Sequence, residues 1–410
     1  MFSLPTLDSF PVKDHRVLMR VDLNVPLDNG KILDTTRIDR VIPEITYLLQ
    51  NQAKVILMAH LGRPKGQPAA AFSLKVLLDM LAQKLGQPIF FSSDCVGTEA
   101  KQAVSKLQPG EVLLLENLRF HAGEENNDLE FAQRLAELGD LYVNNAFSVS
   151  HRAHASVEAI THLLPVYAGK ALAVEIHALI SALEHPKGPL MGIVGGSKVS
   201  TKISVLHRLV EKLDILVLGG GIAHTFLLAN GVEIGKSICE PAQMDVAKDI
   251  MLSAKKQKTE IYLPEDAVVV EDFTTFSGHN VRDMDEVRSG EIILDIGPKT
   301  VEKITQLVSQ NATLVWNGPL GLLERPPYDR GSISVAKAIA RQTASGELFS
   351  VAGGGETVTA INRAQCADKF SYVSTAGGAF LEFLEGKRLP GLEIVYCGER
   401  ERSNHSFSDY

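Results

Sequence analysis

The sequence predicts an α/β protein built from two doubly wound parallel-sheet domains of the Rossmann-like kind, joined by a helical hinge. Three observations predict this fold class. Short apolar runs alternate with stretches of helical periodicity along the whole chain. The apolar runs are continuous, which is typical of parallel strands that helices cover on both faces. The pattern also starts again after the central stretch Leu190–Lys202.

The apolar runs predict the positions of the main strands, and the periodic stretches between them predict helices. In the first half, strands are expected at Val17–Val25, Lys54–Ala59, Glu111–Leu115 and Leu141–Phe147, with helices at Ser73–Leu85 and Leu129–Leu138. In the second half, a short strand from Leu190 is followed by strands at Asp214–Leu218, Glu291–Leu294, Ala312–Trp316 and Leu348–Val351, with a helix at Ser332–Arg341.

A helical stretch between Tyr167 and Pro189, which ends at a segment rich in proline and glycine, predicts the connection between the domains. We expect a first domain over residues 1–170, a connecting helix and hinge over 171–188, a second domain over 189–388, and a C-terminal segment over 389–410.

Composition and charge exclude several classes of protein. The 410 residues are 45% apolar and 22% charged, which suits large cores and excludes a disordered chain. A net charge of −8 argues against a general nucleic-acid binder. The chain has neither a basic leader nor an apolar run long enough to span a membrane, so we expect a cytoplasmic protein. Four cysteines without a C-x-x-C pair predict reduced thiols: Cys95, Cys239, Cys366 and Cys397.

The central stretch runs from an apolar strand into Gly195-Gly196 and then into a helical pattern that carries Lys198 and Lys202. Backbone N–H groups at a helix start, with two lysines one helical turn apart, would bind a phosphate. A plain strand-to-helix turn with solvated lysines fits these four residues equally well. The residues that follow the other strands distinguish between the two interpretations.

In the first half, polar and cationic residues follow the strands, where ligands of doubly wound sheets bind. Each single arginine is most simply a solvated surface residue, but together they would line one crevice that suits a phosphate and a carboxylate. The histidines could instead indicate a metal, although no carboxylate or cysteine at metal-binding spacing accompanies them. These strand-end residues are Asp22, Asn24, His60-Leu61-Gly62-Arg63, Arg119 and His151-Arg152-Ala153-His154, with Arg37 opening the first helix.

In the second half, the strand ends carry glycines and few charges. Glycine lets the backbone approach a flat base or a phosphate, so this domain suits a nucleotide, although each cluster alone could be only a tight turn. The clusters are Gly219-Gly220-Gly221, Asn317-Gly318-Pro319, Gly353-Gly354-Gly355-Glu356 and Gly377-Gly378.

Two motifs in this half are misleading. Gly231–Ser237 resembles a P-loop, but only three residues separate its glycines and it follows a helical stretch, so we expect a helix C-cap and loop. Gly219-Gly220-Gly221 lacks the spacing of a dinucleotide fingerprint, and this absence argues against a dehydrogenase.

Taken together, the motifs resemble those of the phosphoglycerate kinase family, over a stretch from about Val12 to Leu392. The matching motifs occur in the family's order: Arg20–Pro26, His60–Pro64, Leu115–Arg119, His151–Ser156, Gly195–Lys202, Leu294–Pro298, Trp316–Pro319 and Leu389–Gly391.

The resemblance implies a monomeric, cytoplasmic, glycolytic enzyme that transfers a phosphoryl group between ATP and 3-phosphoglycerate, giving ADP and 1,3-bisphosphoglycerate. Mg²⁺ would accompany the nucleotide, a hinge would close during the reaction to exclude water, and the last residues would return to the first domain. Neither a nucleic acid nor a membrane is expected as a partner.

The family's site residues carry over position by position. Phosphoglycerate would be bound by Asp22, Asn24, Arg37, His60, Leu61, Gly62, Arg63, Arg119 and Arg152. The nucleotide would be bound by Gly195, Lys198, Lys202, Gly219, Gly220, Asn317, Glu324, Gly354, Gly355, Glu356 and Thr357, with Glu356 at the metal. The catalytic groups would be Arg37, Lys198, Lys202, Gly355 and Gly378.

This sequence departs from the family pattern at several positions. Asn145 and Glu356 stand where the family usually has Asp, Ala376 replaces a glycine, and Leu322-Leu-Glu324 replaces Val-Phe-Glu. We expect Asn145 to remove a charge near the arginines and Ala376 to add a methyl near the transferring phosphate. The alternative hypothesis is therefore a divergent, low-activity nucleotide-binding or interaction protein on the same fold. The polar tail Glu399–Tyr410 is expected to be disordered.

Overall fold

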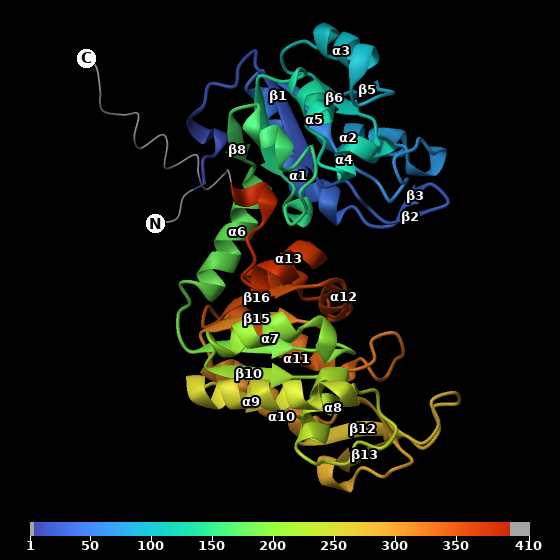
Figure 1. Cartoon of the computed structure of the whole chain (residues 1–410), viewed down its shortest axis with the longest axis vertical. Helices are drawn as coiled ribbons and strands as arrows, with labels where there is room; N and C mark the ends of the chain where they lie inside the picture. The colour runs from blue at the N-terminus through green and yellow to red at the C-terminus, as the bar shows by residue number, and fades with distance from the viewer. Residues whose placement is uncertain (1–3, 394–410) are drawn as a thin grey trace, which may run out of the picture. The chain divides into compact units, whose positions relative to one another are not determined.

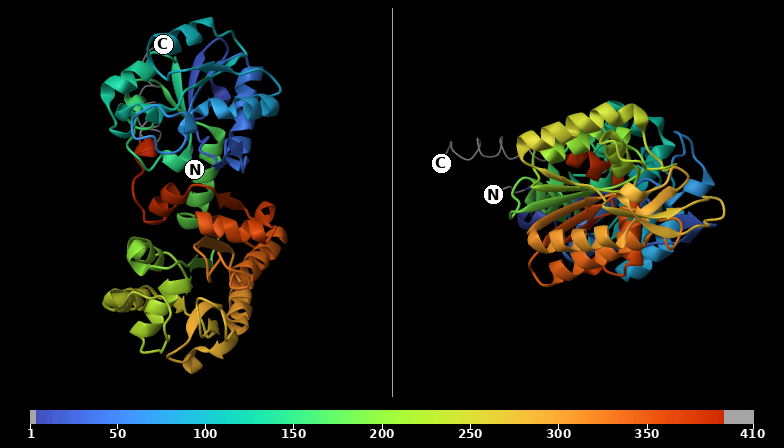
Figure 2. Two further views of the ribbon diagram at one scale, coloured as in Figure 1. Left: turned by 90° about the vertical axis from the view of Figure 1, so that its right-hand side faces the viewer. Right: turned by 90° about the horizontal axis from the view of Figure 1, so that it is seen from below.

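The computed structural model describes residues 4–393, which form two compact units (Figures 1 and 2). Unit 1 contains residues 4–176 together with 388–393, and unit 2 contains residues 177–387. The division falls inside helix α6 (Lys170–Leu183). The tail Glu399–Tyr410, expected to be disordered, lies outside the described residues. Within residues 4–393, no helix has the length and apolar character needed to cross a membrane.

Unit 1 is built on a six-stranded, fully parallel sheet with β1 near its centre. The strand order is β5-β6-β4-β1-β7-β8. In chain order these strands are β1 (Arg16–Val21), β4 (Lys54–Met58), β5 (Phe90–Ser92), β6 (Val112–Leu115), β7 (Leu141–Asn145) and β8 (Val166–Ala168), and a small hairpin pairs β2 (Leu27–Asp28) with β3 (Lys31–Ile32).

Helices cover both faces of this sheet because its strands are apolar on both sides. Helices α1 (Thr36–Gln50) and α2 (Leu78–Leu85) share one core with residues such as Val17 and Met19. Helices α3 (Gly97–Lys106) and α5 (Leu129–Ala136) share the opposite core with Leu18, and the short helix α4 (Ala122–Glu125) precedes α5. Consecutive residues of β1 thus face opposite cores, as doubly wound sheets require.

Unit 2 repeats this architecture and adds a small antiparallel sheet. Its parallel sheet has the order β11-β10-β9-β15-β16-β17, and the antiparallel sheet has the order β13-β12-β14. The strands are β9 (Leu190–Val194), β10 (Ile215–Leu218), β11 (Glu260–Tyr262), β12 (Asp266–Val270), β13 (Asn280–Asp283), β14 (Ile292–Ile296), β15 (Thr313–Asn317), β16 (Phe349–Gly353) and β17 (Tyr372–Ser374).

The helices of unit 2 pack around this sheet (Figure 1). Helices α10, α11 and α12 contribute to the core around Trp316, the largest fully buried side chain. In chain order the helices are α7 (Ile203–Val210), α8 (Gly220–Ala229), α9 (Met244–Gln257), α10 (Pro298–Gln310), α11 (Arg330–Ala344), α12 (Gly355–Arg363) and α13 (Gly377–Leu384).

The predicted fold class is confirmed, and three predicted strands need correction. The run Val17–Val25 leaves the sheet after Val21, and Leu141–Phe147 leaves it after Asn145. The run Glu291–Leu294 forms β14, which pairs antiparallel with β12 outside the parallel sheet. Apolar residues continue past both strand ends because the chain stays buried there, as at Leu23 and Phe147, so hydrophobicity alone overestimates strand length.

Smaller sequence-based expectations can be checked against the same elements. The helix expected at Ser73–Leu85 begins as a 3₁₀ turn and becomes α2 only at Leu78. The misleading P-loop match follows the end of α8, with Gly231 at φ +80°, as expected for a helix C-cap and loop. Cys95, Cys239 and Cys366 are free thiols, and Cys397 lies outside the described residues.

The start of helix α6 is held by two buried side chains of unit 1. Glu44 of α1 accepts a hydrogen bond from the backbone N–H of Lys170 at 2.8 Å. Asn145, at the end of β7, accepts one from the N–H of Leu172 at 3.2 Å. The Asn145 side chain is therefore used at the connecting helix, so the expected effect of its missing charge on the arginines is replaced by an effect on this helix start.

The C-terminal segment also returns to unit 1. The Asn144 side-chain amide donates to the carbonyl oxygen of Gly391 at 3.0 Å, and the N–H of Gly391 donates to the carbonyl of Ser150 at 2.9 Å. Gly391 approaches Ser150 so closely that an added Cβ would lie 3.0 Å from its Cα. Residues 388–393 are thereby fixed to the end of β7.

Replacing Glu44 by glutamine should make the protein more stable at alkaline pH. Burial raises the pKa of Glu44 from 4.5 to about 7. Its stabilising contribution is therefore complete below pH 4.5 and is lost as the pH rises through 7. The shift corresponds to a penalty of about 3 kcal/mol for the ionised form, which a neutral glutamine avoids. Urea unfolding at pH 4.5, 6 and 8 measures the difference between Glu44→Gln and the unmodified protein.

A matched control for this prediction is Glu137→Gln. Glu137 is an exposed carboxylate of the same unit, paired with Lys101 at 2.6 Å, and its replacement should leave the pH dependence of unfolding unchanged. If Glu44→Gln and the unmodified protein lose stability equally between pH 4.5 and 8, the ionisation of Glu44 does not limit stability.

Candidate active site

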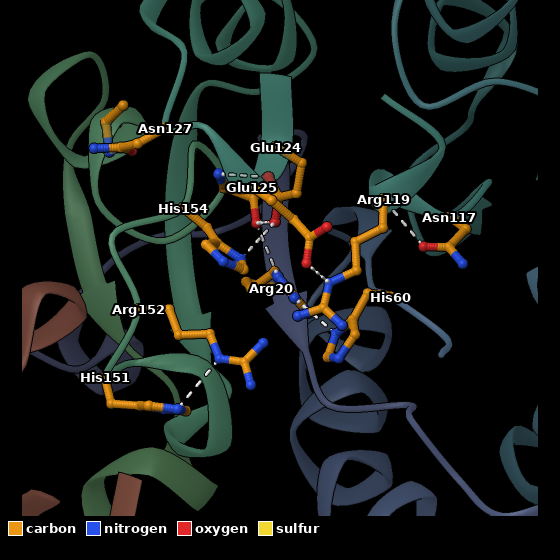
Figure 3. A network of polar contacts seen from close by, with 12 residues as sticks. Arg20, His60, Asn117, Arg119, Glu124, Glu125, Asn127, His151, Arg152 and His154 are labelled. Carbon is orange, nitrogen blue, oxygen red and sulfur yellow. Dashed lines mark hydrogen bonds and ion pairs between the residues drawn. The ribbon is translucent and has the colours of Figure 1, made fainter. Parts of the chain in front are cut away.

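Three arginines gather at the carboxyl edge of the unit 1 sheet: Arg20, Arg119 and Arg152 (Figure 3). Arg119 follows β6 in a 3₁₀ turn and is only 3% exposed. Its Nη1 donates to the carbonyl of Gly62 at 2.8 Å, and its Nε lies 3.3 Å from a Glu125 carboxylate oxygen. Its Nη2 has no hydrogen-bond partner among the described residues. Buried donors are rarely left unpaired, so this group is suited to receive an anion.

Burial and the neighbouring arginines also shift pKa values in this cluster. Burial lowers the pKa of Arg119 to about 10, and repulsion from Arg152 and Arg20 adds to the effect. An anion bound here would remove that repulsion, and the guanidinium groups would supply charge-assisted hydrogen bonds.

The second part of the unit 1 site is a chain of contacts after β1. Asp22 binds Arg37 of α1 at 2.9 Å and accepts a hydrogen bond from the Ser148 hydroxyl at 2.6 Å. The Asn24 side chain accepts from the N–H of Gly62 at 2.9 Å. The structure thus links predicted site residues that follow β1 and β4 with Arg37 of α1. Arg63 is exposed and Leu61 is buried, and neither takes part in these contacts.

The histidines of the cluster are neutral at physiological pH. Burial, followed by the nearby arginines, lowers the pKa of His154 to about 3 and that of His151 to about 4. The same causes hold the pKa of His60 well below its usual range. Within residues 4–393 the group of side chains arranged like metal ligands is Asp94, Cys95 and His121, which includes none of these histidines. The alternative of a metal bound by His151 and His154 gains no support.

In unit 2, Lys202 lies where the two central strands of the sheet, β9 and β15, end. Its Nζ donates to the carbonyl oxygens of Gly195 at 2.7 Å and Asn317 at 3.1 Å. Burial lowers its pKa to about 8, against a smaller opposing effect of Glu356. In this sheet the strand order reverses between β9 and β15, which is the position where doubly wound sheets bind ligands.

The expectation that Lys198 and Lys202 share one helix face is wrong. Lys198 is exposed and precedes a 3₁₀ turn at Val199–Thr201, whereas Lys202 follows that turn with a non-helical φ of −131°. Helix α7 begins only at Ile203. The helical periodicity in the sequence starts earlier than the helix because the 3₁₀ turn has nearly the same spacing.

Two glycines of the unit 2 loops are needed for close packing. A Cβ on Gly195 would lie 1.8 Å from the carbonyl oxygen of Pro319, and one on Gly318 would lie 2.2 Å from the carbonyl of Gly195. Gly195, predicted to contact the nucleotide, thus packs against the neighbouring loop. Two other predicted residues also support loops: Thr357 accepts from the N–H of Gly318 at 2.6 Å, and the Asn317 amide donates to Gly353.

A cavity of about 330 Å³ opens beside these loops and is mainly apolar. Ile238 and Phe273 contribute half-exposed apolar side chains to its wall, which suits contact with a flat base. Of the residues predicted to bind nucleotide, three line this cavity: Gly220, Glu324 and Glu356. The others lie outside its wall: Gly195, Lys198, Lys202, Gly219, Asn317, Gly354, Gly355 and Thr357. The sequence analysis missed Ile238 and Phe273. Their apolar character at isolated positions in loops was the signal that could have indicated them.

The starts of helices α12 and α13 complete the unit 2 site. Gly355 and Glu356 form the exposed first turn of α12, and Gly377 and Gly378 form that of α13. Free backbone N–H groups and the positive end of the helix dipole make such termini suitable for phosphates. Ala376, just before α13, is 1% exposed, so its additional methyl group is packed inside the unit.

Unit 1 has an arginine cluster suited to a small anion. Unit 2 has a nucleotide-sized cavity and helix starts suited to phosphates. Together these two sites define a class of protein. This class is the phosphotransferases that move a phosphoryl group between a nucleotide and a small acidic acceptor. A family model described as phosphoglycerate kinase matches residues 7–387. The chain belongs to the phosphoglycerate kinase family.

Individual relatives support this assignment over nearly the whole chain. The phosphoglycerate kinase of Rhizobium meliloti is 51% identical over 95% of this chain and 98% of its own length. That of Methylorubrum extorquens is 52% identical over 95% of this chain and 97% of its own length. A solved structure of the Coxiella burnetii phosphoglycerate kinase superposes with a TM-score of 0.88 at 40% identity, covering 97% of this chain and 100% of the other.

Proposed function

We propose that this protein catalyses the reversible transfer of a phosphoryl group between ATP and 3-phosphoglycerate, giving ADP and 1,3-bisphosphoglycerate, as a glycolytic step. The observation that carries this proposal is the buried arginine cluster of unit 1, in which Arg119 retains an unpaired donor among the residues that the structure describes. It suits an acceptor that carries both a phosphate and a carboxylate. The nucleotide cavity of unit 2 supports a nucleoside triphosphate as the other substrate.

In unit 1, the acceptor would be bound in two regions. Arg119 and Arg152 would hold the non-transferring phosphate, since guanidinium groups bind phosphate oxygens in bidentate fashion. Asp22 and Asn24 would hold the hydroxyl and carboxyl part of the molecule. Arg37, already oriented by Asp22 at 2.9 Å, would face the carboxylate that accepts the phosphoryl group. His60, Leu61, Gly62 and Arg63 would complete the enclosure.

In unit 2, the base would lie between Ile238 and Phe273, and Glu324 would accept hydrogen bonds from the ribose hydroxyls. The phosphates would extend toward Lys202 and the start of α12. A phosphoryl group in transfer spreads negative charge over three oxygens, so catalysis consists mainly of positioning and charge stabilisation. Lys198, Lys202 and the backbone N–H groups of Gly355 and Gly378 would supply this stabilisation. A protein nucleophile is not required.

The site fits Mg²⁺ bound together with the nucleotide. Glu356 lines the nucleotide cavity with an exposed carboxylate, and Mg²⁺ in nucleotide sites is usually held by one or two carboxylates together with phosphate oxygens. When bound, the ion would neutralise phosphate charge. Glu356 would hold it from the first turn of α12. We further propose that the enzyme acts as a monomer in the cytoplasm.

A coupled spectrophotometric assay with ATP, Mg²⁺ and 3-phosphoglycerate tests the proposed function directly. We expect ADP formation that requires both substrates. The alternative, a low-activity binding protein on this fold, would bind nucleotide without turnover. The comparisons do not favour that alternative. Of the departures that suggested it, Asn145 contacts the start of α6, Ala376 is buried inside the unit, and Glu356 lines the nucleotide cavity.

Variants of Glu356 test its role at the metal. If its carboxylate holds Mg²⁺, Glu356→Ala should weaken Mg²⁺-nucleotide binding by about ten-fold or more, on the scale expected for a residue that orients a metal site. Glu356→Asp should leave this affinity unchanged or increase it, because the shorter side chain carries the same charge. Titration with Mg²⁺ at fixed ATP measures both.

The competing interpretation is that Glu356 only stabilises the first turn of α12 through the helix dipole. In that case Glu356→Ala would lower thermal stability slightly and leave the apparent Mg²⁺ affinity unchanged. Glu302→Ala, which removes an exposed acid from α10, is the control and should affect neither quantity.

A further inference from the structure

Arg20 is an arginine inside a central strand of unit 1, with no exposed surface. Its guanidinium donates three hydrogen bonds: Nε to the Ser156 hydroxyl at 3.0 Å, Nη1 to the carbonyl of Val21 at 2.6 Å, and Nη2 to His60 Nδ1 at 3.0 Å. A buried guanidinium is costly unless its charge is compensated. A residue near Arg20 supplies the opposite charge.

The compensating charge is Glu124, from helix α4, which is also fully buried. Its two carboxylate oxygens accept hydrogen bonds from the backbone N–H of Ser156 at 3.0 Å and from the Ser156 hydroxyl at 2.6 Å. The Ser156 hydroxyl therefore contacts both charged groups.

The directions of these hydrogen bonds follow from the chemistry of the groups. A carboxylate only accepts and a guanidinium only donates. The Ser156 hydroxyl must therefore donate to Glu124 and accept from Arg20, and His60 Nδ1 must accept from Arg20. A neutral imidazole that accepts at Nδ1 carries its proton at Nε2.

We propose that Glu124 and Ser156, acting through Arg20, are positioning residues that fix His60 as the neutral Nε2–H tautomer. His60 then donates a hydrogen bond to a phosphate or carboxylate oxygen of phosphoglycerate and adds no charge to the arginine cluster. The identity of this ligand rests on the proposed function, whereas the tautomer is a property of the free protein.

The surroundings of His60 support a neutral ring. The charged and titratable groups that act on it are Arg20, Arg119, Arg152 and His154, and together with burial they hold its pKa well below the usual range. Repulsion therefore prevents a second proton, but repulsion alone does not select which nitrogen carries the first. The contact with Arg20 makes that selection, and Arg20 is in turn oriented by Ser156 and balanced by Glu124.

The tautomer is measured by ¹⁵N NMR of histidine-labelled full-length protein, without substrate, at pH 7.5. His60 is assigned by comparison with His60→Gln. We expect one neutral ring with the proton on Nε2. A proton on Nδ1, a cationic ring or a mixture of tautomers in the unmodified protein would overturn the proposal, and this result is independent of whether the protein turns over phosphoglycerate.

The network is tested by Ser156→Ala and Glu124→Gln. Both should give a mixture of His60 tautomers and raise the dissociation constant for 3-phosphoglycerate by about five- to fifty-fold, the scale of one weakened hydrogen bond to a charged group. Nucleotide affinity, measured by titration with ADP, should change by less than about two-fold, because ADP binding depends on residues of unit 2. His60→Gln retains a donor near the Nε2 position and should bind 3-phosphoglycerate more tightly than His60→Asn.

Ser350→Ala is the matched control. Ser350 is a fully buried serine of unit 2 whose hydroxyl accepts from Thr343 at 2.8 Å, so its loss should cost comparable stability without changing the His60 tautomer. An unchanged single Nε2–H tautomer in Ser156→Ala and Glu124→Gln, with unchanged 3-phosphoglycerate affinity, would remove these residues from the positioning role. If the unmodified protein shows the expected tautomer but does not bind 3-phosphoglycerate, the proposed function fails and the tautomer assignment stands.

Discussion

Replacing Arg37 by alanine should lower turnover at least 100-fold while leaving the fold intact. Arg37 lies in the first turn of helix α1, and Asp22 holds its guanidinium at 2.9 Å. A preorganised donor that stabilises developing negative charge contributes about 3 kcal/mol to the transition state. Its side chain is 28% exposed, so the lost ion pair should cost at most about 1 kcal/mol of stability. The coupled assay gives turnover, and circular dichroism reports the fold.

Arg16→Ala is the control for this experiment. Arg16 lies at the opposite end of β1 and also pairs with a carboxylate, Asp140, at 2.6 Å. It should lose a similar amount of stability without losing activity. A turnover within about three-fold of the unmodified protein in Arg37→Ala would exclude a direct catalytic role for Arg37, because it leaves less than about 0.7 kcal/mol for the interaction.

Replacing Lys202 by methionine should lower kcat/KM for ATP at least 100-fold. Its ammonium group joins the carbonyls of Gly195 and Asn317 at the ends of β9 and β15. It is a partly buried cation of unit 2 close to Gly196 of the cavity wall. A hydrogen bond to a charged group contributes about 1.5–3 kcal/mol, and the variant loses both the loop contacts and the phosphate contact. Steady-state kinetics with varied ATP measures the effect.

The depressed pKa of Lys202 also predicts a pH dependence. Half of this amine is uncharged near pH 8 in the free protein. Bound phosphates favour the charged form and raise this pKa, so nucleotide binding takes up a proton above pH 8. ADP affinity should therefore weaken as the pH rises from 8 to 10, and Lys202→Met should abolish that dependence.

Lys212→Met is the matched control for Lys202. Lys212 is also a partly buried lysine of unit 2, and its Nζ donates to the carbonyl of Leu183 and to Glu184. Its loss should leave nucleotide affinity and its pH dependence unchanged. If Lys202→Met retains the affinity of the unmodified protein at every pH, Lys202 serves only to hold the loops.

The sequence was sufficient to predict the parallel sheets and the residues that follow their strands. Continuous apolar runs can be satisfied only by a doubly covered sheet, and residues after parallel strands must meet at one edge. Asp22, Asn24 and Arg119 were found in this way, and the structure connects Asn24 and Arg119 through Gly62. The prediction worked here because it depended on topology and not on side-chain direction.

Side-chain direction explains what could not be predicted. Arg20 lies within a strand pattern, and no local rule shows that its guanidinium turns inward to Ser156 and His60. A charged residue in a buried strand was nevertheless a signal that a partner must exist.

Asn145 was misjudged for the same reason, because its neighbour at the start of α6 is distant in sequence. Of the three antiparallel strands of unit 2, β14 was predicted, whereas β12 and β13 were missed because they lie between loops of irregular composition.

The glycines of unit 2 fall into two kinds, which differ in the space available for a side chain. Gly195 and Gly318 have no room for a methyl group, so alanine at either position would displace the neighbouring loop whether or not a ligand is bound. Gly355 and Gly377 face open space, and a Cβ there would meet nothing within 4 Å. Only an incoming ligand gives a reason to keep glycine at these two positions. Alanine at either position would leave the packing of unit 2 undisturbed, so ligand binding is the property that such a change would affect.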